Sequence, residues 1–175
     1  MTGLKRILVT MVSLSLMSIL QTLVLPRIGF LIALPNLLLI IVMASGFLFG
    51  KAYGLFVGVL TGLLIDVIGT GTPGFHALIL MWIGYADGFL SEKMESEIIP
   101  VLYLILLANE VLYHLYQFVF GFLIGAKFPF LPYLKETVIP ETLLTLVVFL
   151  PIYGLLLFIS KRWDLKINKG EVKVV

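Results

Sequence analysis

The sequence has no cysteine and only two histidines among its 175 residues. Without thiols the chain can form no disulfide, and its thiol content says nothing about the compartment in which it works. Structural zinc sites draw their ligands from several cysteines and histidines, so this composition argues against such a site. The sequence therefore leads us to expect no metal and no cofactor.

Charged residues are also few, and they make up 13% of the chain. Hydrophobic residues make up 61%, and the mean hydropathy is +1.14. A water-soluble domain of this size would not have enough polar side chains to cover its surface. The composition therefore predicts an all-α integral membrane protein, because a helix satisfies its own backbone hydrogen bonds in lipid.

Motifs for catalysis are missing from the sequence as well. We find no nucleophile–base pair, no phosphate-binding loop and no dinucleotide-binding fingerprint. An enzyme is therefore the least supported class of function, and we expect no catalytic residue. The formal net charge is only +2, so basic residues here indicate orientation in the membrane and not binding to nucleic acid.

Six apolar stretches follow one another along the chain. A hydrocarbon core of about 30 Å is crossed by roughly 20 helical residues. The expected helices cover residues 7–25, 35–49, 52–68, 76–90, 100–125 and 138–160. They predict a single six-helix transmembrane domain over residues 1–160, followed by a basic cytoplasmic tail over residues 161–175.

Prolines suggest where two of these helices begin. Pro35 suits a first helical turn, so residues 28–34 are interpreted as an embedded lead-in, and whether they are re-entrant stays open. Residues 127–137 hold two prolines and three aromatic side chains, which is typical of an interfacial loop. Pro140 then fits the first turn of the sixth helix, and Pro151 should kink its interior.

The basic residues predict the orientation. Six crossings place both termini on one side, and nine of the twelve basic residues then fall on that side: Lys5, Arg6, Lys51, Lys93, Lys161, Arg162, Lys166, Lys169 and Lys173. Arg27, Lys127 and Lys135 fall on the other. By the positive-inside rule, both termini are expected in the cytoplasm.

Glycines recur every four residues from Gly46 to Gly62, and the next step of four is Asp66. Lys51 would be costly inside one long apolar helix, so we expect a tight turn near Gly50 and Lys51. Four residues turn a helix by about 400°, so the later glycines of the series and Asp66 share one broad face. Such a face, formed by Gly54, Gly58 and Gly62, lets a second helix approach closely in lipid, and packing alone explains it.

Packing does not explain Asp66, because an ionisable side chain in an apolar segment usually faces a partner or a watery cavity. It lies near the end of the third helix. It can pair with His76 across the following turn, pair with a basic residue of a partner protein, or lie at the level of the lipid headgroups.

The fifth expected helix carries a polar cluster formed by Asn109, Glu110, His114 and Gln117. Glu110, His114 and Gln117 follow one another at spacings of four and three, which places them on one helical face. A proton relay is one interpretation. An internal ion pair or hydrogen bond that fastens this helix to its neighbours is favoured, because a relay needs further stations. Glu141 is interpreted as structural, since a carboxylate is stabilised in the first turn of a helix.

Residues 35–90 also carry a resemblance to a known family. The segments are PNLLLIIV at 35–42, GFLFGKAYGLFVGVLTGLLID at 46–66, GTPGFHAL at 71–78 and IGYADGFL at 83–90. This pattern resembles the MreD family of rod shape-determining proteins, and the later half of the chain is similar only in hydropathy.

The resemblance implies a non-catalytic scaffold in the bacterial cytoplasmic (inner) membrane that supports cell shape and lateral peptidoglycan synthesis in the elongasome. Its implied partners are MreC, a bitopic membrane protein, with MreB, RodA and a penicillin-binding protein nearby. The face formed by Gly54, Gly58 and Gly62 is then the first candidate for a helix of the bitopic partner.

The family also resembles the six-helix substrate-binding subunits of energy-coupling-factor transporters. This implies the alternative function, a small-solute-binding transporter subunit, in which Asp66, Asn109, Glu110 and His114 would line a ligand cavity.

Overall fold

The computed structural model describes residues 2–27, 33–69, 73–94, 99–123 and 129–162. These residues form helices and connections without any strand. The helices are α1 (Thr2–Ile19), α2 (Leu37–Phe49), α3 (Lys51–Ile68), α4 (Phe75–Lys93), α5 (Ile99–Leu123), α6 (Phe130–Tyr133) and α7 (Ile139–Arg162). Short η segments extend two of them, namely η1 (Leu20–Val24) and η2 (Leu25–Arg27) after α1, and η3 (Leu134–Val138) between α6 and α7.

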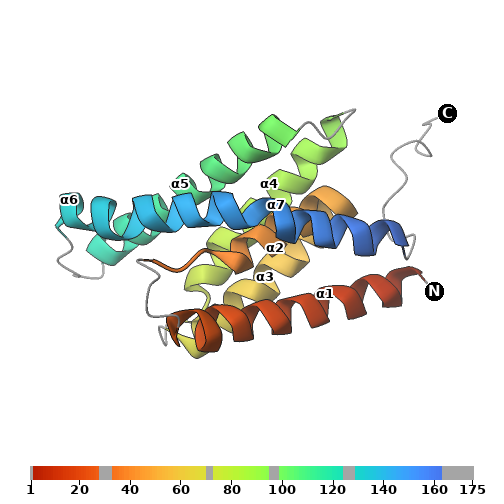
Figure 1. The fold of residues 1–175 in the computed structure, drawn as a ribbon, viewed down its shortest axis with the longest axis horizontal. Coiled ribbons are helices and arrows are strands. Elements are labelled where there is room, and N and C mark those ends of the chain that lie inside the picture. The colour runs from red at the N-terminus through yellow and green to blue at the C-terminus, as the bar shows by residue number, and fades with distance from the viewer. Residues whose placement is uncertain (1, 28–32, 70–72, 95–98, 124–128, 163–175) are drawn as a thin grey trace.

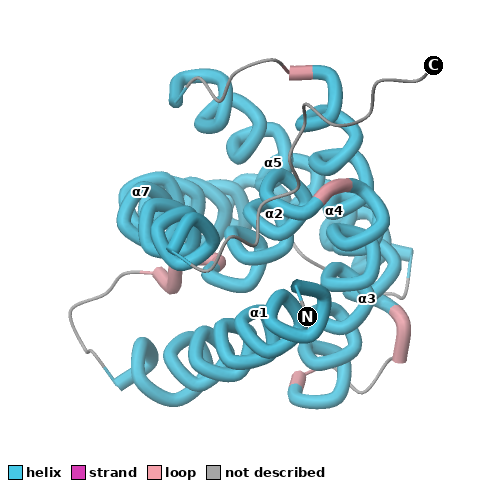
Figure 2. The backbone as a smooth tube through the Cα atoms, turned by 90° about the vertical axis from the view of Figure 1, so that its right-hand side faces the viewer, coloured by secondary structure: helices cyan, strands magenta, loops and turns pink. Residues whose placement is uncertain are grey.

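Helix α2 is the centre of the bundle. All 13 of its residues are buried, and it contacts α1, α3, α4, α5 and α7. At about 1.5 Å per residue it is roughly 20 Å long, which is shorter than a hydrocarbon core of about 30 Å. The neighbouring helices enclose it (Figure 2), so its continuous apolar run reflects burial in protein.

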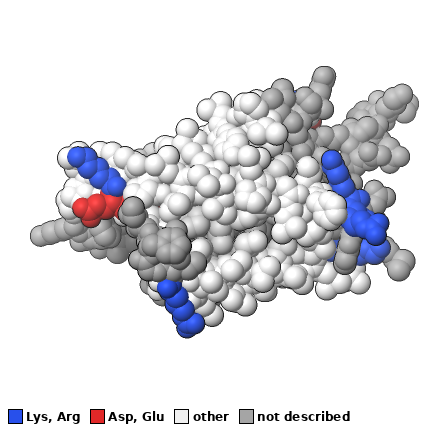
Figure 3. Space-filling model, viewed as in Figure 1, with Lys and Arg blue, Asp and Glu red and all other residues white. Residues whose placement is uncertain are grey.

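Four helical segments are long and apolar enough to cross a membrane: Ile7–Arg27, Lys51–Ile68, Ile99–Phe122 and Phe130–Arg162. Figure 1 shows the helices running back and forth, with the N-terminus, the α2–α3 turn, the end of α4, the start of α5 and the end of α7 toward one end of the long axis. Figure 3 shows the visible charged side chains at the two ends, with an uncharged band between them. This arrangement fits a membrane-spanning helix bundle.

The expected turn at Gly50 is confirmed. Gly50 has φ 91°, a value that favours glycine, and Lys51 begins α3 directly after it. At the start of α2, Asn36 caps the helix by accepting a hydrogen bond from the backbone N–H of Leu39. The helix therefore begins two residues after Pro35, close to the expected position.

The expected interfacial loop over residues 127–137 is wrong for its described part. Helical turns begin at Phe130 and continue through η3 into α7. Pro132 lies in the first turn, where a backbone N–H would have no helical partner in any case. Pro140 follows the wide π-turn of η3, and Pro26 likewise follows the π-turn η1. Proline has no backbone N–H to donate, and the wide π-turn before it lets the helix continue without that hydrogen bond.

Several predictions from the sequence fall outside the described residues. These are the structure of the lead-in at 28–32, the position of Lys127, and the tail beyond Arg162 with Lys166, Lys169 and Lys173.

Candidate functional site

The glycine face of α3 packs against α4 of the same chain. A Cβ atom added at Gly54 would lie 2.2 Å from the backbone oxygen of Gly84, and one at Gly58 would lie 2.1 Å from that of Leu80. At Gly62 it would lie 2.2 Å from the Cα of Ala77. These distances leave no room for a side chain, so the two backbones touch at three positions over about two turns of helix.

The prediction that a partner helix binds at Gly54, Gly58 and Gly62 is therefore corrected. The physical reason is that α4 carries its own glycines, Gly84 and Gly88, at four-residue spacing and fits the same face. Packing alone was the favoured explanation of these glycines, and it is the one that the geometry bears out.

Asp66 caps the N-terminus of α4 from the end of α3. Its carboxylate accepts hydrogen bonds from the backbone N–H groups of Gly74 (2.8 Å), His76 (2.9 Å) and Ala77 (3.4 Å). It also lies 2.8 Å from Nδ1 of His76. Of the three expected roles, pairing with His76 across the turn is the one found. The negative charge also suits the positive end of the α4 dipole.

A series of polar contacts continues from His76 across α5 to α6. Gln117 Nε2 lies 3.5 Å from His76 Nε2, and the Tyr133 hydroxyl donates to Gln117 Oε1 at 3.3 Å. The same hydroxyl lies 3.3 Å from His114 Nδ1. Together with Asp66 these residues form one connected set, which we call the buried polar chain.

Three titratable groups meet where the buried polar chain ends at His114. His114 Nε2 lies 3.4 Å from Glu110 Oε2 and 3.9 Å from Glu141 Oε2. Glu110 is fully buried, His114 is 3% exposed, and the side chain of Glu141 is 20% exposed. Glu110, His114 and Gln117 thus share a face of α5, as expected, and Glu141 brings α7 to that face.

Asn109 lies apart from the other members of the predicted cluster. Its amide donates to both carboxylate oxygens of Asp87 on α4, at 3.0 and 2.9 Å. Neighbouring helical residues point about 100° apart, which is why Asn109 meets α4 while Glu110 meets α7. The expected four-residue cluster is therefore two separate polar contacts.

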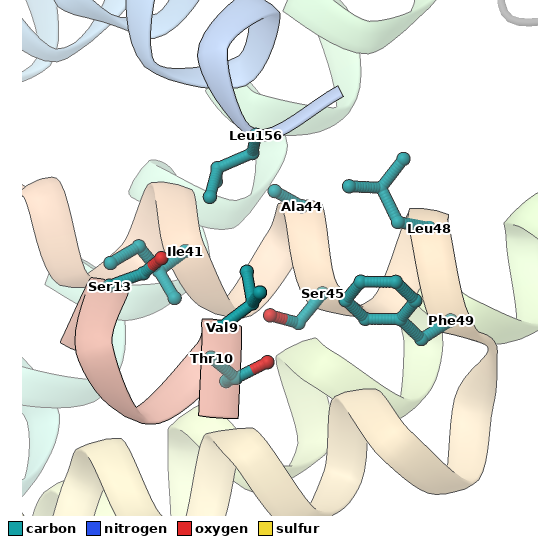
Figure 4. A pocket seen from close by; sticks show the side chains of 9 residues that line it. All are labelled: Val9, Thr10, Ser13, Ile41, Ala44, Ser45, Leu48, Phe49 and Leu156. Atoms are coloured by element: carbon teal, nitrogen blue, oxygen red, sulfur yellow. The ribbon is translucent and has the colours of Figure 1, made fainter. Parts of the chain in front are cut away.

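Described residues line three pockets between the helices. One of about 210 Å³ is bounded by α5, α6 and η3, and both His114 and Tyr133 line it. Another, of about 140 Å³, lies between α1, η1 and α3, with Gln21 and Tyr113 on its wall. The third, shown in Figure 4, lies between α1, α2 and α7. Its volume of about 10 Å³ accepts at most a single water molecule, although Thr10, Ser13 and Ser45 bring hydroxyl groups to it.

Two members of this site were not singled out from the sequence. Tyr133 was assigned to a loop, and Glu141 was interpreted as a structural carboxylate. Pro140 suggested that a helix starts next to Glu141, and therefore that Glu141 lies at the surface. For this reason the sequence did not indicate that Glu141 belongs to the site. A helix continuing back to Phe130 would have placed both side chains on a membrane helix facing α5.

The comparisons with known proteins agree with the resemblance seen in residues 35–90 and extend it. The family model described as rod shape-determining protein MreD matches residues 4–161. Neither the comparison with curated proteins nor that with solved structures gave a match.

Proposed function

The chain belongs to the family of rod shape-determining protein MreD, and from this premise we propose that it is a non-catalytic membrane scaffold of the bacterial elongation machinery. In this role it binds an MreC-like bitopic protein and supports lateral peptidoglycan synthesis with MreB, RodA and a penicillin-binding protein. The family match over residues 4–161 is the observation that carries the proposal.

The short stretches of sequence between consecutive helices support a scaffold that works inside the membrane. One residue, Gly50, separates α2 from α3, and five residues separate Lys93 from Ile99. A partner must therefore bind largely through the outer faces of the helices or the tips of these connections. Because α4 occupies the glycine face of α3, the helix of a bitopic partner is expected on another side of the bundle.

Orientation is part of the same proposal. Of the basic residues with described side chains, Lys5, Lys51, Lys93, Lys161 and Arg162 belong to the end with the N-terminus, and Arg27 and Lys135 to the other. The positive-inside rule favours the first end as cytoplasmic. We therefore propose six crossings of the inner membrane, with both termini in the cytoplasm.

The rival proposal is a small-solute-binding subunit with the fold of the energy-coupling-factor subunits. It would need Asp66, Asn109, Glu110 and His114 to line one cavity. Asp66 is engaged by the start of α4, and Asn109 is engaged by Asp87, which supports the scaffold over a shared solute site.

A pull-down of the tagged protein from mild detergent with its native membrane partners tests the choice. Mass spectrometry of the captured proteins should identify an MreC-like bitopic protein. Recovery of cytoplasmic ATP-binding subunits with a coupling membrane protein would instead establish the transport function.

Photo-cross-linking from single positions then maps the partner face. Val12 on α1, Leu104 on α5 and Val147 on α7 are 65%, 66% and 72% exposed, so a photoreactive residue there samples three sides of the bundle. Phe149, fully buried on α7, is the matched control. We expect one exposed position to cross-link to the bitopic partner. Equal yields from the exposed positions and from Phe149 would argue against a specific interface.

A further inference from the structure

At His114, the end of the buried polar chain brings an imidazole and two carboxylates together. Both carboxylate oxygens of Glu110 and the Nε2 atom of His114 lack a hydrogen-bond partner within the described part of the chain. One ligand atom from each of Glu110, His114 and Glu141 lies within 4.8 Å of the other two. Buried polar atoms are normally satisfied, so these three groups need a proton or a cation between them.

The hydrogen bonds of the polar chain are compatible with a neutral His114 that carries its proton on Nδ1. The single hydroxyl hydrogen of Tyr133 goes to Gln117 Oε1. In this arrangement the Tyr133 oxygen accepts from His114 Nδ1, at 3.3 Å. In a neutral imidazole this leaves a lone pair on Nε2, and that lone pair faces the two carboxylates.

Two carboxylates and an imidazole lone pair would repel one another in a membrane interior unless a positive charge lies between them. We propose that Glu110, His114 and Glu141 bind a divalent transition-metal cation, with Zn²⁺ as the representative ion. Two carboxylates and one divalent cation form a neutral group, which removes the cost of burying separate charges. The Tyr133 contact at Nδ1 orients the imidazole, as an outer hydrogen bond does in known metal sites.

The geometry is close to what Zn²⁺ needs. Ligand atoms about 2.0–2.2 Å from a tetrahedral ion lie roughly 3.3–3.6 Å apart. The contact from His114 to Glu110 is already 3.4 Å, and the contact to Glu141 is 3.9 Å. Glu141 is the least buried of the three and can close the remaining distance. The three side chains leave a fourth position for water, and the cavity beside His114 gives access from the α5–α6 side.

This proposal departs from the expectation drawn from composition. Counting cysteine and histidine argued against zinc, but carboxylates also ligate zinc, with one or two histidines sufficing in mixed sites. The ion would link α5 to α7, so its binding should also stabilise the bundle.

Zinc binding by the purified full chain tests the site. The protein carries a tag without histidines, is stripped with a chelator in mild detergent, and is titrated with ZnCl₂ against a chromophoric chelator. We expect one Zn²⁺ per chain and a rise in the thermal unfolding temperature. Co²⁺ should give the visible absorption of a low-symmetry nitrogen and oxygen site.

Glu110→Gln and His114→Gln should each weaken Zn²⁺ binding at least about tenfold. Glu136→Gln is the matched control, because it removes the same charge from an exposed residue of η3 and should change nothing. If Glu110→Gln fails to fold, the more exposed Glu141→Gln takes its place. Absence of Zn²⁺ binding by the folded wild-type chain would overturn the site in favour of a shared proton, and so would unchanged binding in the variants. Neither result depends on partner capture.

Discussion

Asp66 joins α3 to α4 through four hydrogen-bond donors, and all of them lie in the segment from Gly74 to Ala77. Asp66→Asn replaces one acceptor oxygen by an amide nitrogen, which would face the donors. We expect the free energy of unfolding to fall by roughly 2–4 kcal/mol, from a lost cap and lost charge-assisted hydrogen bonds. Unfolding by SDS in mixed micelles measures the change.

Glu92→Gln serves as the control for that experiment. Glu92 pairs with Lys51 at 2.9 Å, but both side chains are more than 40% exposed. Exposed ion pairs contribute little, so the unfolding curve should not move. A shift as large as that of Asp66→Asn would mean that general charge, and not the cap, sets the stability.

Asn109 and Asp87 form a separate buried pair between α5 and α4. Asn109→Leu removes the amide that both oxygens of Asp87 use, and it should lower the free energy of unfolding by roughly 3 kcal/mol. Replacing both residues by leucine should cost less than Asn109→Leu alone, because no unpaired polar group remains in the membrane. The same SDS unfolding assay compares the single and double variants. A double variant less stable than the single one would contradict this account.

At the residue scale, the sequence predicts which side chains share a face of one helix. It does not predict which side chains meet when they lie on helices far apart in the sequence. Glu110 and His114 are four residues apart, so their shared face followed from helical geometry alone. Glu141 lies 31 positions after Glu110, and Tyr133 lies 19 positions after His114. Only the packing of α6 and α7 on α5 brings these side chains together. The Asp66–His76 pair was among the expected alternatives because a short turn limits their separation.

The contact of α3 with α4 is the closest helix packing in the bundle, and a pair of glycines tests it. Gly58→Ala places a methyl group 2.1 Å from a backbone oxygen of α4, which cannot move without separating the helices. We expect a loss of about 1–3 kcal/mol or more in the free energy of unfolding, again measured by SDS titration.

Gly154 on α7 gives the opposite expectation from the same substitution. A Cβ atom there would meet nothing within 4 Å. Gly154→Ala should therefore be neutral or stabilise by up to about 1 kcal/mol, since alanine favours the helix. Equal effects at Gly58 and Gly154 would show that helix propensity and not interhelical distance decides the outcome.

The helices themselves were largely predictable, because apolar runs of this length have few alternatives in lipid. The turn at Gly50 followed from Lys51 and the glycine spacing. The continuous helix from Phe130 did not, because Pro129 and Pro132 suggested a loop and Pro140 suggested a helix start. A π-turn before Pro140 lets the helix run on through it. The identity of the helix on the glycine face was also missed, although Gly84 and Gly88 repeat the four-residue spacing on α4.

At the scale of the whole molecule, the distribution of basic residues predicts which end faces the cytoplasm. The described helices place Lys51, Glu92 and Lys93 at the end that holds the N-terminus, and Arg27 and Lys135 at the other. A band without visible charged side chains separates the two ends on the face seen in Figure 3. The sequence predicted this division because each basic residue lies next to an expected helix end.

The absence of native cysteine makes this orientation directly measurable. Glu92→Cys and Lys135→Cys each introduce the single thiol of the chain at an exposed position, one at each end. A membrane-impermeant maleimide added to intact spheroplasts should label the cysteine at 135 and leave the cysteine at 92 unlabelled until the membrane is permeabilised. The expectation rests on five basic residues with described side chains at one end against two at the other. The reverse labelling pattern would invert the orientation while leaving the bundle intact, and labelling of both positions before permeabilisation would contradict a membrane barrier between the two ends.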